Sequence, residues 1–167
     1  MIRKIFVFLL IALIVIQFFH PGKNQTGGNQ PRNIASVYAL PANVKTILDK
    51  ACADCHSNNT EYPWYSKIQP VDWWMAGHVN EGKRELNFDE FATYELRRQY
   101  HKLEEISKTV KEEEMPLNSY TWIHKNAILT DEEKNSMIAW ADGIRNDLKQ
   151  KYPIDSLERK DRKDRPF

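Results

Sequence analysis

Apolar positions along most of the chain recur at the spacing of α-helices, and no segment shows the sustained alternation that a half-buried strand requires. The first apolar segment differs, because Ile5–Ile16 contains no polar residue and follows the basic residues Arg3 and Lys4. Gln17 then separates it from Phe18 and Phe19. A charged start followed by an all-apolar run predicts an export signal or a membrane anchor.

Four later segments carry one apolar face each, with start and stop signals at their ends. Pro70 is suited to a first helical position, Asn87 with Glu90 and Thr130 with Glu133 fit capping boxes, and Pro116 and Pro153 should end helices. The apolar faces comprise Val44, Ile47 and Leu48; Val71, Trp74, Met75, His78 and Val79; Leu103, Ile106 and Val110; and Met137, Ile138, Ala141, Ile144 and Leu148. The chain is therefore predicted to be all-α.

The predicted cellular location of the protein depends on this first apolar segment. Ile5–Phe19 spans about 22 Å as a helix, which is shorter than the ~30 Å hydrocarbon core and fits a signal-peptide core by length. The bulky residues Gln17–Pro21 do not offer the small-x-small cleavage site that a removable signal needs. An uncleaved signal anchor over residues 1–20 is therefore favoured over a cleaved signal or a buried core helix. The positive-inside rule then places the remainder outside the cytoplasm.

The remaining organisation follows from composition. Residues 21–33 are polar and contain Gly and Pro, which predicts a flexible linker. Residues 34–152 carry the helical patterns and should form the folded domain, and residues 153–167 form a charged tail. The chain has 24 Lys and Arg residues against 23 Asp and Glu residues, so it lacks the excess of positive charge that is typical of nucleic-acid-binding proteins. With 11% aromatic residues it can build a ring-rich core.

Both cysteines of the chain lie in one pentapeptide, Cys52-Ala-Asp-Cys55-His56. This is the Cys-x-x-Cys-His form to which haem c is attached. Two thiols at this spacing lie on one side of a helical turn, where each can add to a haem vinyl group, and the next residue offers an imidazole to the iron. His56 should then donate its second ring nitrogen to a backbone carbonyl, for which Pro63 and Pro70 are candidates.

Three other uses of a cysteine pair explain less of this sequence. A thioredoxin-like redox pair needs a preceding strand, half of a zinc site needs two more ligands at suitable spacing, and a structural disulfide gives His56 no role. Covalent attachment of one haem is therefore the preferred interpretation, and attachment outside the cytoplasm agrees with the predicted anchor.

The second axial ligand of the iron has several candidates. Met115 is preferred, because it lies after a helix and directly before Pro116, where its side chain can enter a pocket from a loop. His101 and His124 would instead give a bis-histidine site, and an open sixth position is a further alternative. Met75, His78 and Met137 lie on apolar helix faces, where packing is the simpler explanation. Of the aromatic residues, Trp64, Tyr65 and Trp74 are candidates to cover the porphyrin.

The chain resembles the haem-binding domain family of small, membrane-anchored, cytochrome-c-like bacterial proteins. The resemblance runs from about Leu48 to Trp140. It includes Cys52 to Thr60, Tyr62-Pro-Trp-Tyr65, Pro70-x-x-Trp73-Trp74, His78-x-x-Glu81-Gly82, Leu86-Asn-Phe88, Glu114-Met115-Pro116 and Ala139-Trp140. It implies a monohaem, mostly helical, cytochrome-c-like domain with His56 as proximal and Met115 as distal ligand.

These observations together predict a membrane-tethered c-type cytochrome on the periplasmic face of a bacterial inner membrane. It would exchange single electrons with redox partners that the sequence does not identify, and no residue is assigned a catalytic role. The alternative is a haem-based sensor or a peroxidase-like enzyme, which requires an open or displaceable distal site. A third possibility is that haem only holds together an interaction domain.

Overall fold

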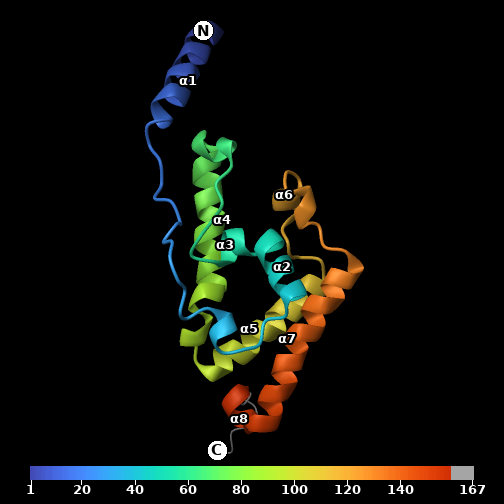
Figure 1. Ribbon diagram of the computed structural model, residues 1–167. Helices are drawn as coiled ribbons and strands as arrows, with labels where there is room; N and C mark the ends of the chain where they lie inside the picture. The colour runs from blue at the N-terminus through green and yellow to red at the C-terminus, as the bar shows by residue number, and fades with distance from the viewer. Residues whose placement is uncertain (159–167) are drawn as a thin grey trace, which may run out of the picture. The chain divides into compact units, whose positions relative to one another are not determined.

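The computed structural model describes residues 1–158, and these residues form helices joined by loops, with one isolated β-bridge between Gln25 and Asn59 and no strand (Figure 1). The predicted all-α class is confirmed for this part of the chain. In order, the elements are α1 Ile2–Ile16, η1 Ile34–Ser36, α2 Ala42–Ala51, α3 Ala53–His56, η2 Trp64–Lys67, α4 Val71–Glu85, η3 Phe88–Thr93, α5 Leu96–Lys111, α6 Asn118–Thr121, η4 Lys125–Ala127, α7 Asp131–Lys151 and α8 Ile154–Leu157, where η marks a 3-10 helix.

The chain divides into two compact units that do not follow the order of the sequence. The first unit combines Met1–Gly28 with Asp54–Asn87, and the second combines Asn29–Ala53 with the residues from Phe88 onward. Each unit is therefore built from two separate stretches of chain, and each is described by itself below.

The core of the second unit lies between α5 and α7, which pack against each other (Figure 1). The apolar positions that the helical spacing predicts on both helices are buried, with the exception of the half-buried Ile138. Trp140 adds a hydrogen bond from its indole N–H to the carbonyl oxygen of Ala39 at 3.0 Å. The predicted capping box of α7 is present, since Thr130 and Glu133 bond to each other's backbone N–H groups.

Two predicted boundaries differ in the structure. Asn87 and Glu90 do not cap a helix; the segment after Asn87 is the 3-10 helix η3, and α5 begins only at Leu96. The Asn87 amide instead donates to the Asn58 side chain at 2.8 Å. At the other end of the chain, α8 follows Pro153 and buries Leu157, so the predicted charged tail begins with a packed helical turn. Residues 159–167 lie outside the described part.

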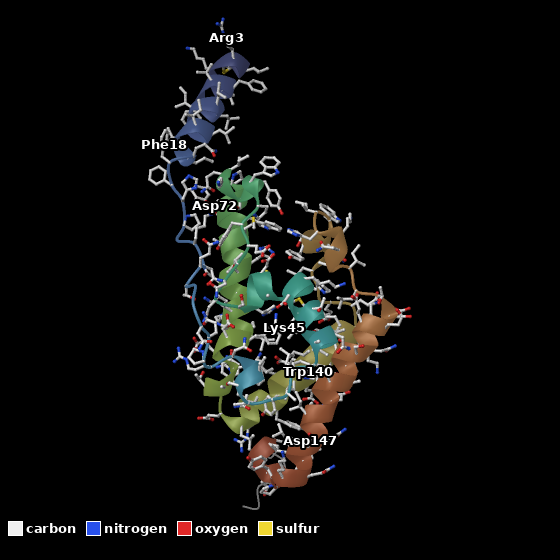
Figure 2. The ribbon with its side chains drawn as sticks, viewed as in Figure 1. Arg3, Phe18, Lys45, Asp72, Trp140 and Asp147 are labelled. Atoms are coloured by element: carbon white, nitrogen blue, oxygen red, sulfur yellow. The ribbon has the colours of Figure 1, made fainter. Side chains whose placement is uncertain are left out.

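The first unit is organised around α4, along which the segment after α1 runs (Figure 1). Gln17 and Gln69 exchange two hydrogen bonds, and the Gln69 amide donates to the carbonyl oxygen of Phe19. The buried carboxylate of Asp72, at the start of α4, pairs with His20 and with Lys23, both at 2.7 Å. Figure 2 shows Phe18 at the end of α1 and Asp72 at the N-terminal end of α4.

The apolar helix predicted at the N-terminus is present as α1, and most of its large side chains are exposed. It has 15 residues, and none of the helices described for this chain combines the length and apolarity needed to cross a membrane. The predicted membrane-spanning helix is therefore not found in the form expected.

The predicted linker, residues 21–33, makes hydrogen bonds that its composition does not suggest. Asn24 exchanges backbone and side-chain bonds with the loop at Ser57 and Thr60, and Thr26 N–H donates to Asn58 O at 3.1 Å. In the second unit, Asn33 donates to Asp89 at 2.7 Å. The sequence predicted a flexible linker because the hydrogen-bond partners of these polar residues are distant along the chain and are not visible in the local composition.

Asp72 gives a prediction for the first unit. Burial raises its pKa, but hydrogen bonds from Lys23 and His20 lower it further, so the pKa lies below the usual value. The stabilisation by ionised Asp72 should be complete at pH values above the pKa of the unfolded state, about 3.9, and should be lost as the pH falls below the lower pKa of the folded state. We expect Asp72→Asn to cost about 2 kcal/mol of unfolding free energy at pH 7. In urea unfolding, the difference from wild type should shrink at pH 3; an equal difference at both pH values would contradict this account.

Candidate functional site

The cysteine-histidine pentapeptide begins where α2 ends. Cys52 is the C-terminal cap of α2, with its N–H bonded to Leu48 O at 3.0 Å, and the short helix α3 then carries Cys55 and His56. All three side chains are partly exposed, and neither cysteine forms a disulfide. The boundary between the two units falls inside this peptide, between Ala53 and Asp54.

His56 is oriented by a backbone carbonyl of the first unit. Its Nδ1 lies 2.9 Å from Leu86 O, at the C-terminal end of α4. A carbonyl oxygen can only accept, so Nδ1 carries the proton and the lone pair of the neutral ring is on Nε2, the nitrogen suited to bind a metal. The expected bond to a carbonyl is confirmed, but the acceptor is Leu86 rather than Pro63 or Pro70.

Gly82 allows α4 to approach the pentapeptide closely. A Cβ atom at this position would lie 2.7 Å from Cys55 O and 3.1 Å from Cys55 Cβ, which is too close for any side chain. The helix therefore contacts the backbone of Cys55 directly. One turn later, Leu86 is in place to accept the hydrogen bond from His56.

The loop after His56 holds α3 from the other side. Thr60 Oγ1 donates to Asp54 O at 2.6 Å, and the Asp54 carboxylate accepts from the N–H of Glu61 at 2.9 Å. Within the loop, Ser57 and Asn59 bond to each other through the Ser57 hydroxyl. The segment through Asn24 completes this network, so the ordered linker also supports the site.

Deprotonation of the Cys55 thiol is strongly disfavoured. Burial first, and the Asp54 carboxylate second, raise its pKa to about 11. Burial, with a smaller contribution from the Asp54 carboxylate, therefore keeps the Cys55 thiol neutral at physiological pH.

Met115 belongs to the second unit and follows a tight helix end. Glu113 N–H donates to Val110 O and Glu114 N–H to Thr109 O, which is the pattern of a Schellman motif closing α5. Glu113 has a φ of 59°, the left-handed conformation that this motif needs and that Gly usually supplies. Met115 is half-buried, and its N–H also donates to Thr109 O. Its assignment as a ligand stays a prediction.

The other proposed ligands have varied surroundings. His101 is exposed on α5, beside Glu104 and Glu105, and Met137 is buried in the core of the second unit. His124 is stacked on Tyr120 with 4.2 Å between ring centroids. In the first unit, His78 lies against the Trp74 ring and bonds to its carbonyl oxygen.

Of the aromatic residues predicted to cover the porphyrin, Tyr65 lies within electrostatic reach of the pentapeptide, because burial first and the Asp54 carboxylate second raise the pKa of its phenol. Trp64 and Tyr65 are on η2, which packs against α4, and Trp74 is in the first turns of α4. Leu86 follows Trp74 by 12 residues, about 18 Å along a helix. Haem contact by these three residues stays a prediction.

Comparison with known families identifies the chain. The model of the haem-binding domain family matches residues 11–143, which is most of the chain and includes the pentapeptide and Met115. The protein therefore belongs to the haem-binding domain family, as the resemblance in its motifs predicted. No curated protein and no solved structure gave a significant match.

The residues of the pentapeptide fit the group that the family binds. Two cysteines outside any disulfide lie within one short stretch, and the bond from Nδ1 to a carbonyl leaves the Nε2 nitrogen of the neutral His56 ring with the lone pair. Bound haem would be held at its iron by the His56 imidazole, and the thiols of Cys52 and Cys55 have the spacing at which haem is usually attached covalently.

Gly82 provides a test of how the site is positioned. We expect Gly82→Ala to force α4 away from Cys55 and to cost about 1–3 kcal/mol, with a parallel loss of bound haem, because Leu86 moves with the helix. Gly77→Ala is the matched control on the same helix, since a Cβ there meets nothing within 4 Å and should stabilise α4 by up to ~1 kcal/mol. Urea unfolding and haem absorbance measure both effects. Equal behaviour of the two variants would contradict the close contact.

Proposed function

We propose that this protein is a monohaem c-type cytochrome domain that is tethered to a membrane and transfers single electrons. The supporting observation is the Cys52-x-x-Cys55-His56 peptide whose histidine donates from Nδ1 to Leu86 O. In this proposal the two thiols attach one haem covalently, His56 binds the iron through Nε2, and Met115 is the distal ligand. The bound haem supplies reversible one-electron exchange at its iron.

The protein's own contribution is to bind and orient rather than to move protons. Donation from Nδ1 to a carbonyl fixes the plane of the His56 ring and raises the basicity of Nε2. A methionine thioether is a soft, weak ligand that favours ferrous iron and raises the reduction potential. Because no acid-base group is assigned to this site, we propose an electron carrier rather than an enzyme.

The proposed location is the periplasmic face of a bacterial inner membrane. Arg3 and Lys4 precede the exposed apolar surface of α1, which supports an anchor with its N-terminus in the cytoplasm. Attachment of haem c outside the cytoplasm is consistent with this orientation. The redox partners would then be proteins of the same compartment or membrane.

Covalent attachment is tested by intact mass. Wild-type protein made in a host competent for cytochrome maturation should carry the added mass of one haem that resists extraction by acidified organic solvent. Cys52→Ser and Cys55→Ser should each weaken attachment, and the double variant should lose all covalent haem. A bare chain in the wild type would overturn the proposal.

The distal ligand is tested by spectroscopy. Wild-type protein should be low-spin, with a methionine-to-iron charge-transfer band in the ferric state and no binding of carbon monoxide in the ferrous state. We expect Met115→Ala to lose the band and to bind carbon monoxide while haem stays attached. Met75→Ala is the control, because Met75 is a half-buried methionine on α4 and should leave the band unchanged.

Two results would favour the sensor or peroxidase-like function instead. One is high-spin ferric iron in the wild type, and the other is ready binding of carbon monoxide without any substitution. An unchanged spectrum in Met115→Ala would reject Met115 alone and leave the carrier function standing.

A further inference from the structure

The N-terminal end of α4 exposes more large apolar surface than the rest of the first unit beyond α1. Trp64 is 74% exposed, Ile68 45%, Trp73 43% and Trp74 50%. These four residues, on η2 and the first turns of α4, are called the aromatic end below. Tryptophans are highly buried on average, so three exposed ones in neighbouring turns indicate a surface that contacts something else.

The aromatic end is fastened to the point where the apolar helix α1 stops. Two hydrogen bonds between the Gln17 side chain and the Gln69 backbone, and one from the Gln69 side chain to Phe19 O at 2.6 Å, join the two directly. Asp72, next to Trp73, holds His20 and Lys23. The exposed tryptophans therefore begin where the apolar surface of α1 ends, and Phe18 and Phe19 lie between them, also exposed.

The length of α1 gives this arrangement a physical consequence. Its 15 residues span about 22 Å, whereas the hydrocarbon core of a bilayer is ~30 Å thick. A short apolar segment is accommodated by local thinning of the bilayer and by interfacial side chains. The residues just beyond α1 must then lie in the headgroup layer rather than above it.

We propose that the aromatic end of the first unit lies in the headgroup region of the membrane that holds α1. This inference rests on the proposed anchor and adds a second, separate contact with lipid. Indole rings suit this layer, since they combine an apolar body with one N–H donor. The exposed Lys67 in η2 adds a cation that favours anionic headgroups.

The contact would also set the distance of the haem attachment site from the membrane surface. Leu86, which holds His56, lies at the opposite end of α4 from the aromatic end, about 18 Å from Trp74 along the helix axis. With one end of α4 in the interface, His56 is kept near the membrane without touching it. The first unit would have a defined orientation rather than a free tether.

Photocrosslinking tests the contact at residue resolution. The full-length haem-loaded protein is placed in vesicles of phosphatidylcholine and phosphatidylglycerol with a diazirine on the headgroup, and adducts are located by peptide mass spectrometry. We expect adducts on residues 64–74 as well as near Phe18. The exposed residues Glu81, Arg84 and Glu85 are the internal control, because they belong to the same unit but lie at the C-terminal end of α4.

The outcomes separate this inference from the anchor. Adducts near Phe18 without adducts on residues 64–74 would overturn the inference and leave the anchor intact, and the tryptophans would then serve haem or a protein partner. Adducts on residues 64–74 alone would support the interfacial contact and overturn the anchor. Adducts at neither segment would overturn both, and equal labelling of residues 81–85 would show non-specific contact and overturn the inference.

A matched pair of variants gives a further measurement. We expect Trp73→Gln to give several-fold fewer headgroup adducts on residues 64–74 than wild type, because an interfacial ring is lost. Trp122→Gln makes the same change on an exposed tryptophan outside the aromatic end and should leave the adduct yield on residues 64–74 at the wild-type level. Equal adduct yields on residues 64–74 in both variants would overturn the interfacial contact.

Discussion

The close approach of α4 to the pentapeptide is the contact on which the site depends. Gly82 lets the helix backbone contact Cys55, and the same helix is capped by Leu86, whose carbonyl oxygen accepts the hydrogen bond from His56 Nδ1. A helix that ended elsewhere would leave this ring with a different tautomer or orientation. The loop network through Asp54 and Thr60 holds α3 on its other side. The His56 ring itself is oriented by a backbone carbonyl, which cannot change protonation.

The predicted linker is held to the first unit by hydrogen bonds, which changes the expected mobility of this unit relative to α1. A free linker would let the haem-bearing part tumble, and its composition predicts that behaviour. Instead, Asn24 joins the loop at Ser57 and Thr60, and Lys23 reaches both Asp72 and Ser66 O. The Lys23 side chain also lies over the Tyr62 ring. The segment is thus part of the support for α3 as well as a connection from α1.

Local patterns predicted much of this fold, and contacts between distant residues explain what they missed. The apolar faces of α5 and α7 and the capping box at Thr130 depend on residues within one or two turns, where spacing is informative. The acceptor for His56 lies 30 residues away, and nothing about Leu86 marks its carbonyl, because any residue offers one. Asn87 resembled a helix cap, but its amide is used by Asn58, so a tertiary contact replaced the local one. The motif Glu81-Gly82 was visible in the sequence, while the reason for its glycine required the packing.

In the proposed function a single rigid element sets the geometry of electron transfer, because α4 contacts Cys55 near one end and the segment after α1 at the other. The pairing of Asp72 with Lys23 and His20 fixes the N-terminal end, and the Leu86 carbonyl fixes the histidine at the C-terminal end. A carrier on a flexible tether finds its partners by swinging between them. A carrier held by α4 presents its haem at one height and in one orientation, so a partner must approach it there. Specificity would then come from the height and orientation of the partner's own redox centre, in addition to any complementarity of charge.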